Sequence, residues 1–312
     1  MWSLRAIRQD VPRTQVVSSR HWTVFAGITL PLLAVLWFLL HTWATPVIAA
    51  MRNDVHQGSV SALRSVAVAR QSGTAVISSV SFTVHYPPGD QAQATIVLRA
   101  LDHFYPQVRA DFGLAPAGPW PVEVETAANM ARIFGPNPPI GAYWQGVIWL
   151  LLPSAWLPPK DVNVAVYEKY GPVAHEITHL ADDLRGGGRL PRWLDEGLAQ
   201  YEDWRLTGYV WWVPDNSFAD GSLYTYAQLD QDFDALPNQA MAYRQALAAT
   251  AALCRAGPGD CLRVITDIAR GQSALQAIAS VLGPARYASW LQAGYWVPGQ
   301  GPLPWTPAGP AP

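Results

Sequence analysis

Hydrophobic and polar residues repeat with two different periods along this chain. Between positions 76 and 86, apolar residues partly alternate with Ser, Thr and His, which predicts a half-buried strand. Residues 92–112 carry apolar side chains at helical spacing and predict a helix despite Pro106. The same patterns predict a helix at 127–134 and short strands at 122–125, 144–152 and 162–166. The first part of the chain is therefore expected to form a lobe of strands and helices.

The pattern beyond residue 170 is helical, which makes the predicted fold class α+β. One helix follows Gly171-Pro172 and ends at the glycines after Arg185, and Pro191 opens a second. Further helices are predicted at 241–253, 261–270, 273–281 and 285–293, whereas 209–225 is aromatic and rich in turn residues.

The helix after Pro172 carries the sequence His175-Glu176-Ile177-Thr178-His179. Two His residues four positions apart on a helix are rotated by only about 40° from one another, so both imidazoles can reach one ion. Glu176 lies beside this pair and can take a proton from water bound to the ion. The alternative is a structural helix with two buried, hydrogen-bonded His residues and a surface Glu.

A catalytic zinc ion takes three protein ligands and keeps one position for water. His175 and His179 supply two ligands, and a Glu from the next helix is the natural third. The segment Trp193-Leu194-Asp195-Glu196-Gly197 places Glu196 near the start of that helix. The two motifs together predict a Zn²⁺ site of the zincin type.

These motifs resemble the gluzincins, and in particular the bacterial peptidase MA-like domain family. The resemblance extends over roughly residues 80–292, and it implies a zincin-like peptidase domain at 76–295 in which Glu196 is the third metal ligand. It also implies that Tyr243 stabilises the oxyanion of the reaction, with Tyr224 and Tyr226 as rivals. Within it, the segment Gly141–Pro153 is similar to the family's strand beside the active-site cleft.

Two departures from related enzymes bear on the substrate. Aminopeptidases of this clan bind the free amine through a Glu at the cleft edge, whereas residues 141–145 here contain no carboxylate, which favours an endopeptidase. Thermolysin-like enzymes orient one His ligand with an Asp four positions after the third ligand, where this chain has Gln200. Asp182, Asp183 or Asp203 remain as substitutes, although Asp182 and Asp183 also fit a solvated helix end.

The amino-acid composition excludes one class of partner and leaves another open. Only 14% of the residues are charged, the formal net charge is −2 and no basic stripe is present, so no nucleic-acid partner is expected. The 15 Trp residues fit either core packing or an aromatic surface that contacts substrate or a bilayer. Lys is scarce beside Arg, which is typical of a GC-rich bacterial genome.

The N-terminal region predicts a membrane anchor. Residues 22–40 are almost wholly apolar, and 19 helical residues span roughly 28 Å, close to the thickness of the hydrocarbon layer. We therefore expect a cytoplasmic tail at 1–20, a transmembrane helix at 21–44 and a juxtamembrane linker at 45–75. Arginines precede the apolar run, so the positive-inside rule places the catalytic domain outside the cytoplasm. A cleaved secretory signal is the alternative, and it would export the enzyme as well.

Two features near the C-terminus agree with export. Cys254 and Cys261 are the only cysteines and flank a turn-forming sequence, so they are expected to form a disulfide bond outside the cytoplasm. The Pro-rich residues 296–312 predict a disordered tail.

The sequence thus predicts a membrane-anchored zinc metallopeptidase in which Glu176 assists the attack of zinc-bound water on a peptide bond. Its partners would be a peptide or protein substrate and the lipid bilayer, and the backbone of residues 147–151 would pair with an extended substrate. Two alternatives remain. One is an inactive, membrane-anchored zinc-binding interaction protein, and the other is a zinc hydrolase of a non-peptide amide or ester.

Overall fold

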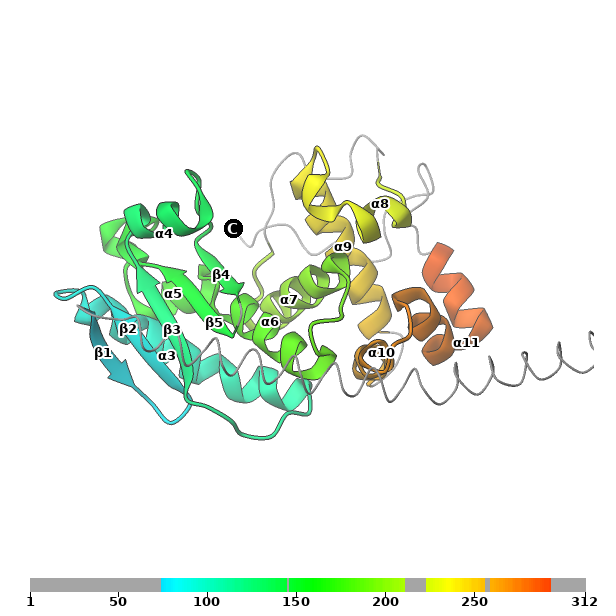
Figure 1. The fold of residues 1–312 in the computed structure, drawn as a ribbon, viewed down its shortest axis with the longest axis horizontal. Coiled ribbons are helices and arrows are strands. Elements are labelled where there is room, and N and C mark those ends of the chain that lie inside the picture. Colours follow the sequence, from blue (N-terminus) through cyan, green and yellow to red (C-terminus); the bar gives the residue numbers. More distant parts are fainter. Residues whose placement is uncertain (1–73, 145, 211–222, 256–258, 293–312) are drawn as a thin grey trace, which may run out of the picture. The chain divides into compact units, whose positions relative to one another are not determined.

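The computed structural model describes residues 74–144, 146–210, 223–255 and 259–292, and these residues have the predicted α+β fold (Figure 1). The strands are β1 (Ala75–Ser78), β2 (Phe82–Tyr86), β3 (Trp120–Glu125), β4 (Gly141–Trp144) and β5 (Val147–Leu151). The α-helices are α3 (Gln91–Asp111), α4 (Ala127–Phe134), α5 (Val164–Tyr170), α6 (Val173–Gly186), α7 (Arg192–Thr207), α8 (Tyr226–Gln231), α9 (Gln239–Cys254), α10 (Asp260–Ala269) and α11 (Ala274–Gln292). Single-turn 3₁₀ helices occur at Pro153–Ala155, Pro159–Asp161 and Phe233–Ala235.

The five described strands form one mixed sheet in the order β1-β2-β3-β5-β4. The three central strands run parallel, and the two outer strands pair antiparallel with their neighbours. Side chains alternate between the two faces of a sheet. One face carries Phe82, Val84, Val122 and Val124, which are buried in the hydrophobic core together with α3. Helix α6 packs against α3 and against β4 and β5, so it lies beside the sheet edge.

Two predicted single strands are in fact hairpins. The stretch predicted at 76–86 divides into β1 and β2, and the stretch predicted at 144–152 begins earlier and divides into β4 and β5. Trp144 pairs with Val147, so the connection is tight, and it contains Gly146 at a φ of +82°. Glycine adopts such a positive φ at little cost, which explains the turn at this position.

The strand predicted at 162–166 is wrong, because this segment starts helix α5. The side chain of Asn163 accepts a hydrogen bond from the backbone N–H of Val166 at 3.0 Å. This bond satisfies one of the free N–H groups at the start of a helix, as an N-cap residue does. The β-branched residues Val164 and Val166 therefore occupy a helix despite their preference for strands.

The two helices that carry the motifs have the predicted bounds to within a residue or two. Helix α6 begins after Pro172 and ends at Gly187, which has a φ of +62° and a left-handed conformation. Helix α7 begins after Pro191. Proline suits the start of a helix because it lacks the N–H that would have no partner there, and glycine suits the left-handed C-terminal position.

Helices α7 and α9 cross at very short range, and a glycine makes this possible. A Cβ atom on Gly197 would lie 2.1 Å from Oγ1 of Thr250 and 2.6 Å from the backbone oxygen of Ala246. No side chain fits at these distances, so Gly197 lets α9 approach the helix that carries Glu196. The approach brings Tyr243, near the start of α9, to the motif residues.

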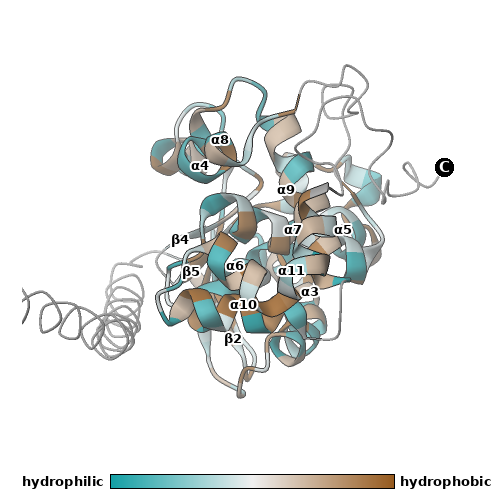
Figure 2. Cartoon of the chain, turned by 90° about the vertical axis from the view of Figure 1, so that its right-hand side faces the viewer, coloured by the Kyte–Doolittle hydropathy of each residue, from teal (hydrophilic) through white to brown (hydrophobic). Residues whose placement is uncertain are grey.

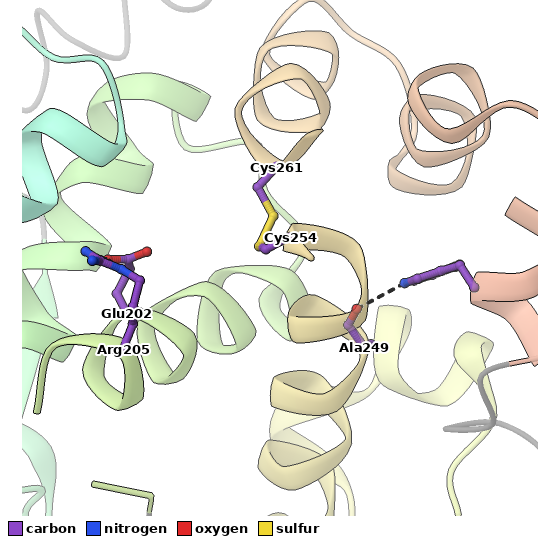
Figure 3. The surroundings of a disulfide bond; sticks show 6 residues. Glu202, Arg205, Ala249, Cys254 and Cys261 are labelled. Atoms are coloured by element: carbon purple, nitrogen blue, oxygen red, sulfur yellow. Dashed lines mark hydrogen bonds and ion pairs between the residues drawn. A yellow bond between two sulfur atoms is a disulfide. The ribbon is translucent and has the colours of Figure 1, made fainter. Parts of the chain in front are cut away.

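The predicted disulfide between Cys254 and Cys261 is present and links the end of α9 to the start of α10 (Figure 3). Helix α10 packs on α6, and it carries both hydrophobic and hydrophilic residues (Figure 2). The two helices predicted at 273–281 and 285–293 form α11, which is kinked where Gly283 has a φ of +71° before Pro284. The predicted helix at 127–134 and the helix through Pro106 are confirmed as α4 and α3.

Several predictions fall outside the described residues. These are the cytoplasmic tail at 1–20, the transmembrane helix at 21–44, nearly all of the linker at 45–75, most of the aromatic segment at 209–225 and the tail at 296–312. Among the helices that the structure describes, none has both the length and the apolar character needed to cross a membrane.

Candidate metal centre

Three side chains from α6 and α7 converge at their nitrogen and oxygen atoms. The Nε2 atoms of His175 and His179 are 3.1 Å apart. Oε2 of Glu196 lies 3.2 Å from Nε2 of His175 and 3.7 Å from Nε2 of His179. The structure thus brings together the three residues that the sequence motifs predict as metal ligands.

The geometry of this triangle fits a small divalent cation. An ion bound tetrahedrally with bonds of about 2.0 to 2.1 Å holds its ligand atoms about 3.3 Å apart, close to the three separations observed here. Oε2 of Glu196 is buried and has no hydrogen-bond partner within the described structure. Two imidazole nitrogens and one carboxylate oxygen are also the donor set of catalytic zinc sites. The donor atoms, their spacing and the unsatisfied oxygen therefore fit Zn²⁺.

Glu176 is buried on the same helix, one residue after His175, and is only 4% exposed. Burial raises the pKa of its carboxyl group above the ordinary value, whereas the nearby imidazoles of His175 and His179 act in the opposite direction. A Cβ atom on Gly141 would lie 2.7 Å from Oε1 of Glu176. The start of strand β4 therefore passes directly beside this carboxyl group.

Asp195 orients one of the imidazoles, and sequence reasoning missed this residue. Its Oδ1 lies 2.9 Å from Nδ1 of His179, which leaves Nε2 of the same ring facing the other two ligand atoms. A carboxylate on the far nitrogen of a His ligand fixes the orientation of the ring. Arg192, Asp195 and Glu196 stand at helical positions i, i+3 and i+4, and this charged pattern is the signal that could have identified Asp195.

Asp195, and none of the residues considered for that orienting role, forms the hydrogen bond to Nδ1 of His179, although one oxygen of Asp182 lies within 4.8 Å of His179 and Asp195. Gln200 donates hydrogen bonds to the backbone oxygens of Glu196 and Tyr243, and Asp183 accepts one from the hydroxyl of Tyr143 at 2.6 Å. Asp182 is 2% exposed, so the expectation of a solvated helix end is wrong for it. Burial, with Asp195 nearby, raises the pKa of its carboxyl group well above the ordinary value.

Asp203 lies two helical turns beyond Glu196 on α7. Burial raises the pKa of its carboxyl group to about 7, and of its charged neighbours His175 lowers that pKa and Glu176 raises it. Its Oδ1 is buried without a hydrogen-bond partner among the described residues. Its carboxyl group therefore interacts electrostatically with His175 and Glu176, while the hydrogen bond to His179 comes from Asp195.

The second oxygen of Glu196 has a separate set of partners. Oε1 lies 2.6 Å from Nη2 of Arg192 and accepts a hydrogen bond from the hydroxyl of Tyr243 at 3.1 Å. Glu196 is 2% exposed. Burial acts to raise the pKa of its carboxyl group, but the imidazoles of His179 and His175 outweigh burial and hold that pKa well below the ordinary value. Glu196 is therefore an anion at neutral pH.

Of the three tyrosines considered as oxyanion donors, Tyr243 is the one that the structure places against the three converging side chains. The hydroxyl of Tyr224 accepts a hydrogen bond from the backbone N–H of Asn238 at 2.7 Å, and that of Tyr226 donates to Asp230 at 2.9 Å. Burial, and then the charge of Glu196, raises the pKa of the Tyr243 hydroxyl, so it remains a hydrogen-bond donor at neutral pH.

The prediction that residues 147–151 pair with an added strand is wrong. Strand β5 is hydrogen-bonded to β3 on one side and to β4 on the other, so its backbone groups are already paired. Strand β4 is the outer strand of the described sheet at this edge, and Trp144 at its end is 53% exposed. The edge next to Glu176 is therefore β4.

No protein-family model matches the chain, and no curated protein matches it. Among solved structures, it is similar to the M1 zinc metallopeptidase from Deinococcus radiodurans, with 20% identity over 77% of this chain and a TM-score of 0.38. An E323A mutant of that enzyme bound to a Tyr-Ser-Ala substrate is 18% identical over 75% of this chain, with a TM-score of 0.37. The chain spans about half the length of these structures (54% of each). A TM-score below 0.5 at such identity assigns neither a family nor an activity.

Proposed function

We propose that this protein is a zinc-dependent metallopeptidase. The observation that carries the proposal is the convergence of His175, His179 and Glu196 beside the buried carboxyl group of Glu176. When bound, Zn²⁺ supplies a Lewis acid that polarises the scissile carbonyl and makes water a nucleophile near neutral pH. Zn²⁺ is the cofactor that this donor set favours.

Each residue of the site then has a distinct role. Glu176 accepts a proton from the attacking water and passes it to the leaving amine, and its raised pKa suits both steps. Asp195 holds the ring of His179 with Nε2 turned to the ion. The hydroxyl of Tyr243, which donates to Glu196 in the substrate-free protein, turns to the substrate and stabilises the oxyanion.

Strand β4 supports an extended peptide as the substrate. It is the outer strand of the described sheet and passes beside Glu176 at Gly141, and backbone groups on an outer strand can pair with an added strand. The cleft-edge segment contains no carboxylate to bind a free amine, which favours an endopeptidase over an aminopeptidase. The apolar segment before residue 45 favours a catalytic domain anchored to a membrane and exposed outside the cytoplasm.

Two rival functions are separable from this one. An inactive zinc-binding interaction protein would hold the metal without turnover, and the buried Glu176 beside the site is a reason against it. A hydrolase of non-peptide amides or esters would use the same chemistry on different substrates.

The decisive experiment compares the purified full-length protein with its Glu176→Gln variant on a library of unstructured peptides. Gln cannot accept the proton, so peptide cleavage should fall by about 10²- to 10⁴-fold. Zinc content, measured by mass spectrometry, should stay at the wild-type level because Glu176 is not a ligand. Zinc-loaded wild-type protein that cleaves no peptide would refute peptidase action, and release of N-terminal residues alone would refute the endopeptidase assignment.

A further inference from the structure

The two carboxylate oxygens of Glu196 contact different groups, and only one of them faces the predicted His ligands. Oε2 points at the two imidazoles at 3.2 and 3.7 Å, whereas Oε1 contacts Arg192 and Tyr243. A carboxylate that binds an ion through both oxygens fills two coordination positions. A carboxylate that binds through one oxygen leaves the extra position to water or substrate, which catalytic zinc requires.

Arg192 makes the shortest contact to Oε1, and its position is fixed by three carboxylates. Nη2 lies 2.6 Å from Oε1 of Glu196, Nη1 lies 3.2 Å from Oδ2 of Asp195, and Nε lies 3.2 Å from Oδ1 of Asp234. The planar guanidinium group presents its donors in a rigid fork, so it can satisfy three acceptors at once. Two of these acceptors belong to residues that contact the predicted His ligands.

We propose that Arg192 is a positioning residue that holds Glu196 to the ion through Oε2 alone and so keeps a coordination position beside the bound water free for substrate. It acts through Glu196 and touches neither the ion nor the substrate. This inference rests on the proposed function, because it presumes that His175, His179 and Glu196 bind a metal. The inference extends the second motif by one residue, because Arg192, four positions before Glu196, sets how Glu196 binds the ion.

The surroundings of Glu196 favour this role over a purely structural ion pair. Glu196 is almost fully buried, and a buried carboxylate oxygen needs a partner. Tyr243 supplies one hydrogen bond to Oε1, but a hydroxyl can rotate away, whereas Arg192 is fixed by Asp195 and Asp234. Without the guanidinium group, Glu196 is free to rotate and offer both oxygens to the ion.

The test replaces Arg192 in the full-length protein by Met, which keeps the length of the side chain but removes its charge and donors. Co²⁺ serves as the probe, because its visible absorption weakens when the second oxygen of Glu196 binds beside the water and raises the coordination number from four to five. The Arg192→Met variant should show weaker absorption than wild type. Its affinity for Zn²⁺, measured by competition with a chelator, should fall by about 10- to 100-fold, as when outer partners of metal ligands are lost.

Arg205→Met is the matched control, because Arg205 lies on the same helix and also pairs with carboxylates. Its side chain is 36% exposed, compared with 42% for Arg192. It contacts Asp111 and also Glu202, beside which it lies in Figure 3. The control should keep the wild-type spectrum and affinity. Arg192→Lys is the second variant, and since an ammonium group cannot reproduce the fork, its spectrum should lie between wild type and Arg192→Met.

The outcomes separate this inference from the proposed function. A wild-type spectrum and affinity in Arg192→Met would overturn the role of Arg192 while leaving the metallopeptidase intact. Equal losses in Arg192→Met and Arg205→Met would also overturn it, because the effect would then be general to α7. Wild-type protein that binds neither Co²⁺ nor Zn²⁺ would refute the proposed function and, with it, the inference. Melting of the metal-free variants checks that each one folds.

Discussion

A buried His lies beside a buried Glu at the candidate metal centre and again in the sheet, at His85 of β2 and Glu123 of β3. In the metal centre the polar atoms face one another at 3.1 to 3.7 Å. In the sheet, both ring nitrogens of His85 and Oε1 of Glu123 have no hydrogen-bond partner within the described residues, and the same holds for Nε1 of Trp149, which is in register with Glu123. Burial of a His and a Glu alone therefore does not indicate a metal site, whereas convergence of their ligand atoms does.

The two groups also differ in charge. At the metal centre the imidazoles hold the pKa of Glu196 well below its ordinary value, so the carboxylate is charged. In the sheet, burial, with Glu125 adding to it, raises the pKa of Glu123 to about 8, and burial lowers the pKa of His85. Around neutral pH the pair in the sheet is therefore largely uncharged. The metal centre therefore presents a carboxylate anion that can bind a cation, whereas the His85–Glu123 pair in the sheet is neutral.

The largest expected effect tests whether convergence is what matters. Replacing His175 by Ala should weaken Zn²⁺ binding by more than the roughly 100-fold that loss of an outer partner costs, because a ligand itself is lost. Replacing His85 by Ala should leave the zinc affinity unchanged. Competition with a chelator measures both variants, and a loss of affinity in His85→Ala would break the comparison.

The next effect concerns the charge of Glu123. Between pH 4.5 and about 8 the folded protein holds this proton more tightly than the unfolded chain, so the free energy of unfolding falls as the pH rises across this window. Glu123→Gln removes that fall, and at pH 9 it should be more stable than wild type by roughly 2 to 4 kcal/mol.

Urea unfolding of metal-free protein at pH 5 and pH 9 measures this difference. The variant and wild type should be close at pH 5, where Glu123 is protonated in the folded protein, and should separate at pH 9. An equal loss of stability in both proteins between the two pH values would contradict the raised pKa.

A smaller loss should follow from Gly197→Ala, which tests how closely the helices must pack around the metal centre. A Cβ atom there collides with Thr250 and with the backbone of Ala246, so the variant should lose about 1 to 3 kcal/mol of stability. Gly186→Ala is the matched control on α6, because its Cβ atom would meet the flexible side chain of Leu190 at 3.0 Å. Urea unfolding that leaves Gly197→Ala as stable as its control would show that α9 can move away.

The smallest effect should come from Asp195→Asn. An amide oxygen can still accept the hydrogen bond from His179, but it lacks the charge, so the zinc affinity should fall by about tenfold. Asp183→Asn is the control, since it removes one charge from α6, the helix that carries His179, at a residue that accepts a hydrogen bond from Tyr143. Similar losses in both variants would mean that the charge of the region, and not the orientation of His179, sets the affinity.

The part of the site that could be predicted from sequence is the part fixed by local geometry. His175 and His179 meet because a helix repeats every 3.6 residues, and the motif on α7 placed Glu196 in reach. Asp195 was missed because the expected orienting Asp stood four positions after Glu196, at Gln200. Which side chain reaches Nδ1 of His179 depends on how α7 is rotated against α6, and that rotation is set by packing.

The fold shows the same limit. Helices with a clear apolar period, such as α3 and α4, were predicted with nearly the observed bounds. The errors occurred where a single polar or glycine residue determines the local structure. Asn163 caps the start of α5, and Gly146 allows the tight turn between β4 and β5. The pairing that leaves β4 at the sheet edge is a long-range property, so it could not be derived from the local pattern.

Gly141 gives the site a simple criterion for recognising it in other sequences. Any side chain at this position would collide with Pro172 as well as with the proton acceptor, since a Cβ atom would lie 2.7 Å from both. A newly sequenced chain with the same two motifs but a bulky residue here would have to move the strand that corresponds to β4 outward. Such a homologue should bind its substrate differently even if its metal ligands are identical.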